Sequence, residues 1–171
     1  MPRIGGNQVN GHRDPNDFYP THPAWTKALL SSVTIRGPVW EPACGDGAIT
    51  KVLKDDGFEV YETDIIHGHD FLNQYGSWSG AIITNPPYKL ADEFIHHALK
   101  LAKQVAMLLP IGALGGQNRF NKLWTINPPA TVVVVAARMP VSGKTSQFNH
   151  FWSFWDKGIS GPTQIIWRKG L

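Results

Sequence analysis

The chain has 171 residues, of which 42% are hydrophobic and 17% charged, a composition that fits one globular domain with a proper core and excludes a disordered chain. Its longest strongly apolar run, residues 130–137, is too short for a membrane span, and a single cysteine excludes a framework of intramolecular disulfides. The first residues lack the apolar stretch of a signal peptide, so we expect a cytoplasmic protein without a membrane anchor.

The first half of the chain predicts helices and strands in alternation. Residues 1–16 are rich in Gly, Asn, Asp and Pro, which indicates a flexible N-terminal arm ahead of a single domain at residues 17–171. Apolar residues with helical spacing then alternate with short buried runs. In chain order, this pattern predicts a helix at residues 23–33, a strand at 38–40, a helix at 48–55 ended by Gly57, and strands at 58–63 and 81–84.

The second half continues this alternation and ends in strands. Strands that alternate with helices favour a doubly wound α/β sheet with helices on both faces, and a terminal hairpin would add an antiparallel edge. The pattern predicts an amphipathic helix at residues 92–103, a strand at 105–109, a short helix at 119–124, a central strand at 131–136, and an aromatic-rich hairpin of strands at 151–155 and 164–168.

A glycine-containing turn, Glu41-Pro42-Ala43-Cys44-Gly45-Asp46-Gly47, joins the first strand to the second helix. Glycines there let the backbone turn sharply and approach a ligand, and the helix begins with free N–H groups. The next strand ends in Asp64, where a carboxylate commonly accepts ribose hydroxyls. Because Thr50 replaces the third glycine of the nicotinamide fingerprint and no phosphate-binding Gly-Lys-Ser/Thr is present, a nucleoside ligand without phosphates fits best. A simple tight turn is the alternative.

The tetrapeptide Asn85-Pro86-Pro87-Tyr88 directly follows the strand at 81–84. Two prolines fix the backbone and remove two donors, so the local carbonyls are rigid acceptors. The Asn85 carboxamide oxygen and a neighbouring carbonyl can then accept hydrogen bonds from one –NH2 group, and Tyr88 can stack on a flat base. The pattern predicts a site for a planar amino group, with a Pro-rich loop of no function as the alternative.

These motifs, in this order, resemble the S-adenosylmethionine-dependent amino-methyltransferases, above all the small DNA adenine N6-methyltransferases of phages and prophages. The tetrapeptide matches the family's catalytic signature at all four positions, and residues 41–47 are similar to its cofactor loop. Residues 17–21 are similar to the segment that covers the methionine end of the cofactor, although His22 separates Thr21 from Pro23. The resemblance spans residues 17–155 and implies a Rossmann-like class I methyltransferase fold with a mostly parallel, seven-stranded sheet.

The resemblance implies that Asn85, Pro86, Pro87 and Tyr88 are catalytic and that a methyl group passes directly to the N6 amino group of adenine in DNA. A target base in a duplex would leave the stack to reach this pocket. In the family, the acid at Asp64 binds the ribose, that at Asp70 binds the adenine amino group, and the aromatic at Phe71 packs on the adenine ring. The implied cofactor-binding residues are Phe18, Tyr19, Thr21, Glu41, Pro42, Ala43, Gly45, Gly47, Asp64, Ile65, Asp70, Phe71 and Asn85.

Positive charge is concentrated late in the chain. Residues 1–110 hold 9 Lys and Arg against 12 Asp and Glu, whereas residues 111–171 hold 7 against 1. Such an excess can serve phosphate contacts, so DNA is the expected partner and RNA the alternative; a solvated basic surface without a partner is the competing explanation. The expected substrate-binding residues are Tyr88, Lys89, Arg119, Lys122, Arg138 and Lys144.

Other chemistries fit the sequence less well. Cys44 follows Ala43 in the glycine turn and has the character of a small packing residue rather than a nucleophile. The run His67-Gly68-His69-Asp70 has no second ligand motif, so we expect no metal. The tetrapeptide leaves RNA adenine, protein glutamine and cytosine N4 open as methyl acceptors, and an inactive subunit with the same fold is a further alternative. Because 171 residues leave no room for a recognition domain, we expect short or relaxed sequence specificity.

Overall fold

The computed structural model describes residues 20–136, 140–141, 144–145 and 149–169. Its centre is a seven-stranded sheet with the order β2-β1-β3-β4-β8-β5-β9. The remaining two strands, β6 (Pro140–Val141) and β7 (Lys144–Thr145), pair only with each other among the described residues. The strands of the large sheet are β1 (Val39–Glu41), β2 (Val60–Glu62), β3 (Ala81–Thr84), β4 (Gln104–Pro110), β5 (Thr131–Ala136), β8 (His150–Asp156) and β9 (Gln164–Lys169).

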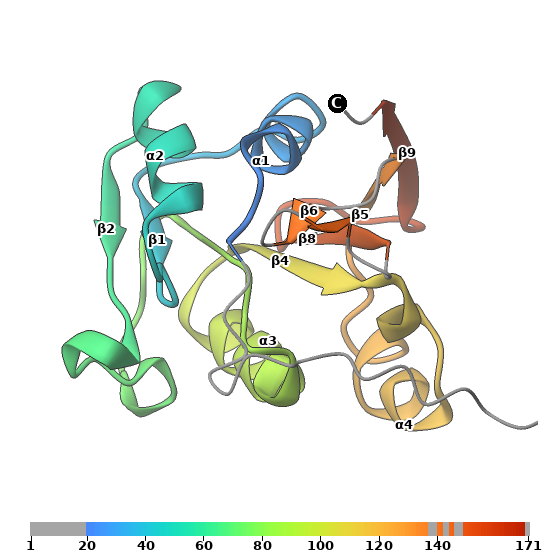
Figure 1. Cartoon of the computed structure of the whole chain (residues 1–171). Helices are drawn as coiled ribbons and strands as arrows, with labels where there is room; N and C mark the ends of the chain where they lie inside the picture. The colour runs from blue at the N-terminus through green and yellow to red at the C-terminus, as the bar shows by residue number, and fades with distance from the viewer. Residues whose placement is uncertain (1–19, 137–139, 142–143, 146–148, 170–171) are drawn as a thin grey trace, which may run out of the picture.

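Helices cover both faces of this sheet. Helices α1 (Pro23–Leu30) and α2 (Ala48–Asp55) lie on one face, and α3 (Ala91–Leu101) and α4 (Gln117–Arg119) lie on the other (Figure 1). Each face has its own apolar core, because side chains alternate along a strand. Ile83 and Trp152 belong to the core under α1 and α2, whereas neighbouring Ile82 and Phe151 belong to the core under α3.

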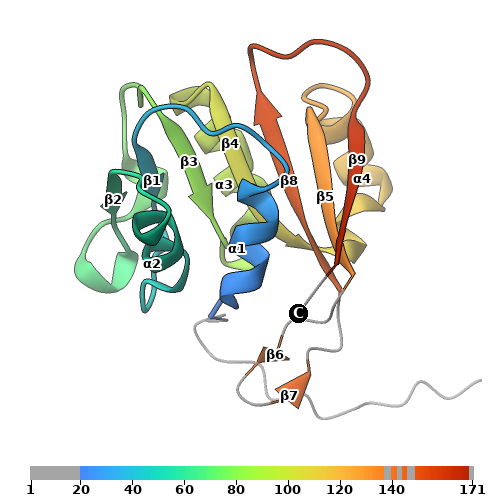
Figure 2. The ribbon, with the colours of Figure 1, turned by 90° about the horizontal axis from the view of Figure 1, so that it is seen from above.

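The sheet confirms the predicted fold class. Parallel ladders join β1 to β2 and β3, β3 to β4, and β5 to β9, so β8 is the one antiparallel strand of the sheet as described (Figure 2). The two late aromatic strands, β8 and β9, do run antiparallel to each other, as expected. They do not pair directly, however, because β5 lies between them and pairs with both. The loop between β8 and β9 therefore spans one intervening strand.

Most predicted elements lie within a few residues of the observed ones. The helix at 48–55 and the strands at 81–84 and 131–136 have the predicted ends. The predicted short helix at 119–124 is instead the single turn α4 followed by a π-helical turn, η5 (Phe120–Trp124). Two 3₁₀ turns that the sequence pattern did not predict, η1 (Ile65–His67) and η2 (Phe71–Asn73), follow β2.

Glycine is required at two kinds of position. In the turn after β1, Gly45 and Gly47 have φ angles of 53° and 78°, in the left-handed region that residues with a Cβ avoid. At the start of β3, a Cβ on Gly80 would lie 1.7 Å from the carbonyl oxygen of Pro38. Gly80 therefore permits the close approach of β3 to β1, the two strands that carry the glycine turn and the tetrapeptide.

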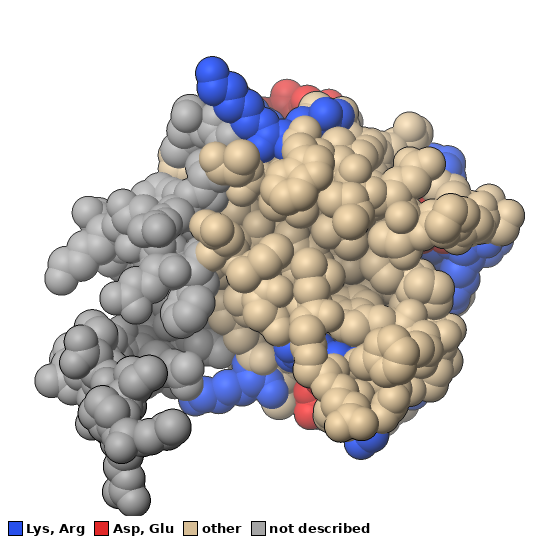
Figure 3. All heavy atoms as spheres, turned by 90° about the vertical axis from the view of Figure 1, so that its right-hand side faces the viewer, with Lys and Arg blue, Asp and Glu red and all other residues tan. Residues whose placement is uncertain are grey.

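The edge strand β9 exposes two large apolar side chains. Ile165 and Trp167 are 61% and 70% exposed. On this side of the molecule, Lys and Arg lie mainly at the margins of the view (Figure 3). Two of the seven Lys and Arg residues after residue 110, Arg168 and Lys169, lie in β9 itself.

Among the described residues, no helix combines the length and the apolarity needed to cross a bilayer.

Candidate active site

A cavity of roughly 600 Å³ opens at the carboxyl ends of β1, β2 and β3. These strands are parallel, so the loops that follow them meet at one edge of the sheet. The volume is within the range of small-molecule sites. The segments that line it are Pro20 and Thr21, the turn from Glu41 to Asp46, the start of α2, residues 64–66 and 69–72, Asn85, Pro87, Leu90 and Phe94.

Asp64 connects two of these loops. One carboxylate oxygen, Oδ2, accepts a hydrogen bond from the Gly45 backbone N–H at 2.8 Å, and Oδ1 accepts one from the Ile66 N–H at 3.0 Å. The side chain lines the cavity although the residue is only 8% exposed. A carboxylate has about four acceptor positions, so Asp64 retains capacity for two hydroxyl donors while it fixes the glycine turn.

Glu41 ends β1 in a nearly closed environment. The residue is 1% exposed, and the Thr50 hydroxyl donates a hydrogen bond to its Oε2. Burial raises the pKa of Glu41 to about 8, and the nearby negative charges of Glu62 and Asp46 act in the same direction. At neutral pH this carboxyl group is therefore largely protonated, and a cation placed in the cavity would favour its ionised form.

The next lining segment combines an acid with apolar side chains. Asp70 accepts hydrogen bonds from the Leu72 N–H at 3.0 Å and from the Asn73 side-chain amide at 2.7 Å. Phe71 is 2% exposed, and its ring lies 5.2 Å from that of Trp40. Ile65, in contrast, is 69% exposed at the cavity rim. A flat ring bound here would contact an exposed aliphatic side chain.

The tetrapeptide borders the same cavity. Asn85 and Pro87 line it, and the Asn85 amide nitrogen donates a hydrogen bond to the Thr21 hydroxyl at 3.2 Å. This bond fixes the orientation of the carboxamide. Pro86 is buried and Tyr88 is half-buried. The glycine turn, Asp64 and the tetrapeptide, which are far apart in the sequence, therefore share one cavity.

His150 is a site residue that the sequence did not indicate. It is 3% exposed, and its ring lies 5.6 Å from the Tyr88 ring at an interplanar angle of 33°. On its other side it meets Trp25 edge-on at 5.8 Å. The antiparallel pairing of β8 with β4 aligns His150 with Pro110, at the same sheet edge as Tyr88. No local motif predicts this contact, because it depends on the position of β8 in the sheet.

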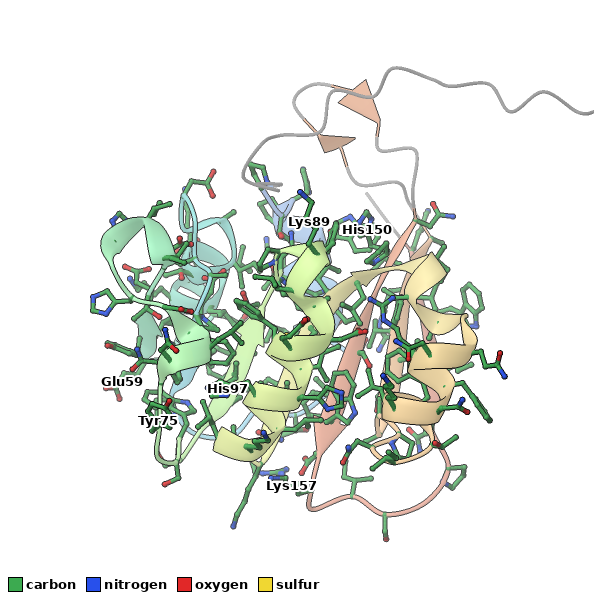
Figure 4. The ribbon with its side chains drawn as sticks, turned by 90° about the horizontal axis from the view of Figure 1, so that it is seen from below. Glu59, Tyr75, Lys89, His97, His150 and Lys157 are labelled. Carbon is green, nitrogen blue, oxygen red and sulfur yellow. The ribbon has the colours of Figure 1, made fainter. Side chains whose placement is uncertain are left out.

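The expected substrate-binding residues are distributed differently from the sequence expectation. Lys89 follows Tyr88 at the same edge as His150 (Figure 4). Arg119 and Lys122 do not line the cavity; they lie in a separate groove beside α3, where Arg119 Nε is 2.6 Å from Asp92 Oδ1. Lys144 is in β7. Phe18, Tyr19 and Arg138 lie outside the described residues.

The described residues contain no group of three or more His, Cys, Asp and Glu side chains arranged to hold a metal ion. Of the run at 67–70, His69 and Asp70 line the cavity, and the Asp70 carboxylate is held by the hydrogen bonds given above.

Cys44 offers a direct test of the environment of the glycine turn. Burial raises the pKa of its thiol to about 11, with additional contributions from Glu41 and Asp64. Two pKa units above the ordinary value of 9.0 reduce the thiolate fraction near pH 8 by about 100-fold. We expect alkylation by iodoacetamide near pH 8 to be slower by this order in the folded protein than in urea. Since Cys44 is the single cysteine, mass spectrometry gives a clean readout, and equal rates in both states would contradict the prediction.

Sheet order and cavity position define a Rossmann-like fold of the class I methyltransferase type. No family model and no curated protein sequence matches the chain. A solved structure described as an RNA methyltransferase from Pyrococcus horikoshii has a TM-score of 0.51 at 11% identity, over 88% of this chain and 93% of that one. The structure of 23S rRNA methyltransferase ErmE has a TM-score of 0.53 at 16% identity, over 84% of this chain and 72% of that one. At these identities the likeness is one of fold.

Proposed function

We propose that this protein transfers a methyl group from S-adenosylmethionine to an exocyclic amino group of a nucleic-acid base, with adenine N6 as the favoured acceptor. The observation that carries the proposal is the single cavity of roughly 600 Å³ that joins the glycine turn and Asp64 to Asn85 and Pro87. A nucleoside cofactor and an amino group bound in this cavity would be in contact, which is what a direct transfer requires.

The residues of the cavity fit the parts of S-adenosylmethionine. Asp64 would accept the two ribose hydroxyls, Asp70 would accept the adenine amino group, and Ile65 and Phe71 would border the adenine ring. The methionine end would lie along the turn, where a buried Glu41 can compensate a positive charge. The contact residues in this assignment are Thr21, Glu41, Pro42, Ala43, Gly45, Asp64, Ile65, Asp70, Phe71 and Asn85, with Gly47 shaping the turn.

In the reaction, the chain positions the acceptor rather than attacking it. When bound, the cofactor supplies an electrophilic methyl group on a sulfonium ion. The Asn85 carboxamide oxygen and the Pro86 carbonyl would accept the two N–H groups of the target amine and hold its nitrogen towards the methyl group. Tyr88, backed by His150 at 5.6 Å, would stack on the base. The nitrogen would take the methyl group as the methyl–sulfur bond breaks and leaves a neutral thioether, and it would then release a proton to water, so no general base is assigned.

Two observations bear on the nucleic acid. The two solved structures compared above are described as RNA methyltransferases, which favours RNA. The match of Asn85-Pro86-Pro87-Tyr88 to the DNA adenine N6-methyltransferases keeps DNA as the second candidate. The two substrates require the same chemistry at the amino group.

The proposal is tested by methyl transfer from labelled S-adenosylmethionine to RNA and to unmethylated DNA in parallel, with nucleoside analysis of the product. N6-methyladenine in either polymer supports the proposal and identifies the substrate. Label in glutamine of a protein extract would keep the chemistry and overturn the nucleic-acid substrate. Failure to bind the cofactor at all, measured by calorimetry, would refute the proposal and favour an inactive subunit.

Asp64→Asn is expected to weaken S-adenosylmethionine binding by at least about tenfold and to lower the free energy of unfolding by about 1–3 kcal/mol. The substituted –NH2 group would face a backbone N–H donor, either that of Gly45 or that of Ile66. Calorimetric titration and urea unfolding measure the two effects. The matched control, Asp55→Asn, changes an exposed carboxylate at the end of α2 and should leave cofactor binding as in the wild type. Equal affinities for both variants would remove Asp64 from the cofactor site.

A further inference from the structure

A second groove of roughly 540 Å³ lies on the face of the sheet covered by α3 and α4. We call it the α3 groove. Its basic side chains are His96, His97 and Lys100 from α3, and Arg119 and Lys122 from α4 and η5. Asp92 and Glu93, at the start of α3, are the acidic residues among its described lining.

Helical periodicity explains why α3 presents these residues together. Phe94, Ile95 and Ala98 are buried in the core, so the opposite side of the helix carries residues 92–93, 96–97 and 100. Acidic residues occupy the first turn of this outer face, where their negative charge interacts favourably with the helix dipole. Basic residues occupy the rest of the outer face. The groove therefore becomes more positive from the start of α3 towards its end.

An ion pair joins the two walls of the groove. Arg119 Nε lies 2.6 Å from Asp92 Oδ1. This contact neutralises Asp92 and holds the guanidinium group at the groove, where its remaining N–H groups can still donate. Apart from this ion pair, the charged side chains of the described groove are the two lysines Lys100 and Lys122 and the one carboxylate of Glu93. The described groove thus has a net positive charge before either histidine is protonated.

His97 adds an unused polar atom. Its Nε2 is buried and has no hydrogen-bond partner in the described part of the chain, and its ring meets Phe71 edge-on at 5.0 Å. Buried polar groups ordinarily have a partner, so this nitrogen marks a position where a ligand or a water completes the site.

The groove adjoins the active site. Leu72 lines both cavities, and α3 begins directly after the turn Tyr88–Leu90 that carries Tyr88 and Lys89. In Figure 4, α3 runs from the edge with Lys89 and His150 down this face, and α4 lies beside it. The 11 residues of α3 correspond to about 16 Å. A chain that enters at the catalytic edge could follow this length, which accommodates several phosphates.

We propose that the α3 groove binds the phosphodiester backbone of the nucleic acid whose base is bound at Asn85 and Tyr88. The inference rests on the proposed function for the presence of a nucleic-acid substrate. Lys100, Lys122 and Arg119 contact the phosphates, and the histidines donate additional hydrogen bonds. These contacts position the strand and do not read its sequence.

The test is the salt dependence of binding of a fluorescent single-stranded RNA, and of a DNA of the same sequence, without cofactor. Lys100→Gln with Lys122→Gln is expected to weaken binding about tenfold at low salt and to reduce the slope of log K against log salt by about 1.4. The matched control, Lys27→Gln with Lys51→Gln, removes the same charge from exposed positions on α1 and α2, on the opposite face of the sheet. This control variant should retain most of the wild-type slope of log K against log salt.

If the two double variants weakened nucleic-acid binding equally, the proposal that the α3 groove binds nucleic acid would be overturned. A wild-type protein that binds neither polymer would also overturn it. Competition by inorganic phosphate or a mononucleotide as strong as that by the oligonucleotide would also overturn it, since the site would then be one for a small anion. Calorimetric titration of the same proteins with S-adenosylmethionine tests the proposed methyltransferase function independently of the groove. If the Lys100→Gln, Lys122→Gln variant binds the cofactor as the wild type does but binds nucleic acid more weakly, both proposals are supported. If nucleic-acid binding depends on the groove but the protein does not bind the cofactor, only the methyltransferase function is refuted.

Discussion

Replacement of Asn85 by alanine is expected to lower the rate of methyl transfer by about 10²- to 10³-fold. The substitution removes an acceptor for the amino group on which positive charge develops, and it abolishes the contact that connects the tetrapeptide to Thr21 at 3.2 Å. Tyr88 and its contact with His150 remain, so nucleic-acid binding should change much less than the rate. Single-turnover transfer and oligonucleotide binding, measured on one preparation, separate the two quantities.

Two further variants sharpen this result. Asn121→Ala changes an exposed amide in η5 and should leave the rate unchanged. Thr21→Val removes the hydroxyl that accepts from the Asn85 amide and leaves Asn85 itself in place. It should lower the rate by an intermediate amount, because the carboxamide is less well oriented. If Asn85→Ala transferred methyl groups at the wild-type rate, the tetrapeptide would have no part in catalysis.

The second large effect is on stability, through Glu41. In the folded protein its pKa is raised to about 8 from an ordinary value of 4.5, chiefly by burial. Between these values the folded protein retains a proton that the unfolded chain has lost. The free energy of unfolding should therefore fall by about 1.4 kcal/mol for each pH unit gained in this window, and level off above it. Below pH 4.5 both states are protonated, and this contribution is constant.

Glu41→Gln should abolish this dependence, because glutamine resembles the protonated acid and can still accept from Thr50. The variant is expected to be more stable than the wild type by a few kcal/mol near pH 8 and about equally stable near pH 5. Urea unfolding at intervals across that range measures the difference. Glu59→Gln, at an exposed position before β2, is the control and should follow the wild-type curve. A constant difference between wild type and Glu41→Gln at all pH values would exclude the raised pKa.

The residues of the candidate site were predictable where a local motif carries the chemistry. The glycine turn is constrained by its own φ angles at Gly45 and Gly47, and the tetrapeptide by its two prolines. Asp64 follows the end of a strand that the periodicity indicates, whereas only the family resemblance indicated Asp70. Such features can be predicted from short stretches of sequence, because they depend on the backbone geometry of only a few residues.

Residues that act through distant contacts could not be predicted in this way. His150 meets Tyr88 because β8 pairs with β4, and Arg119 meets Asp92 because α4 and α3 cover the same face. Arg119 and Lys122 were expected to bind substrate, and in the structure they line the α3 groove and not the cavity of the glycine turn. A count of charges contains no information on which face of the sheet receives them.

The sequence by itself determined the alternation of strands and helices, the turn that a cofactor would need and the tetrapeptide that an amino group would need, since each depends on local periodicity or backbone restriction. Only the tertiary structure decided that β5 lies between β8 and β9, that Glu41 is buried deeply enough for its pKa to be raised, and that two cavities meet at Leu72. These properties arise from contacts between segments that are far apart in the chain, which the order of residues does not specify until the sheet is assembled.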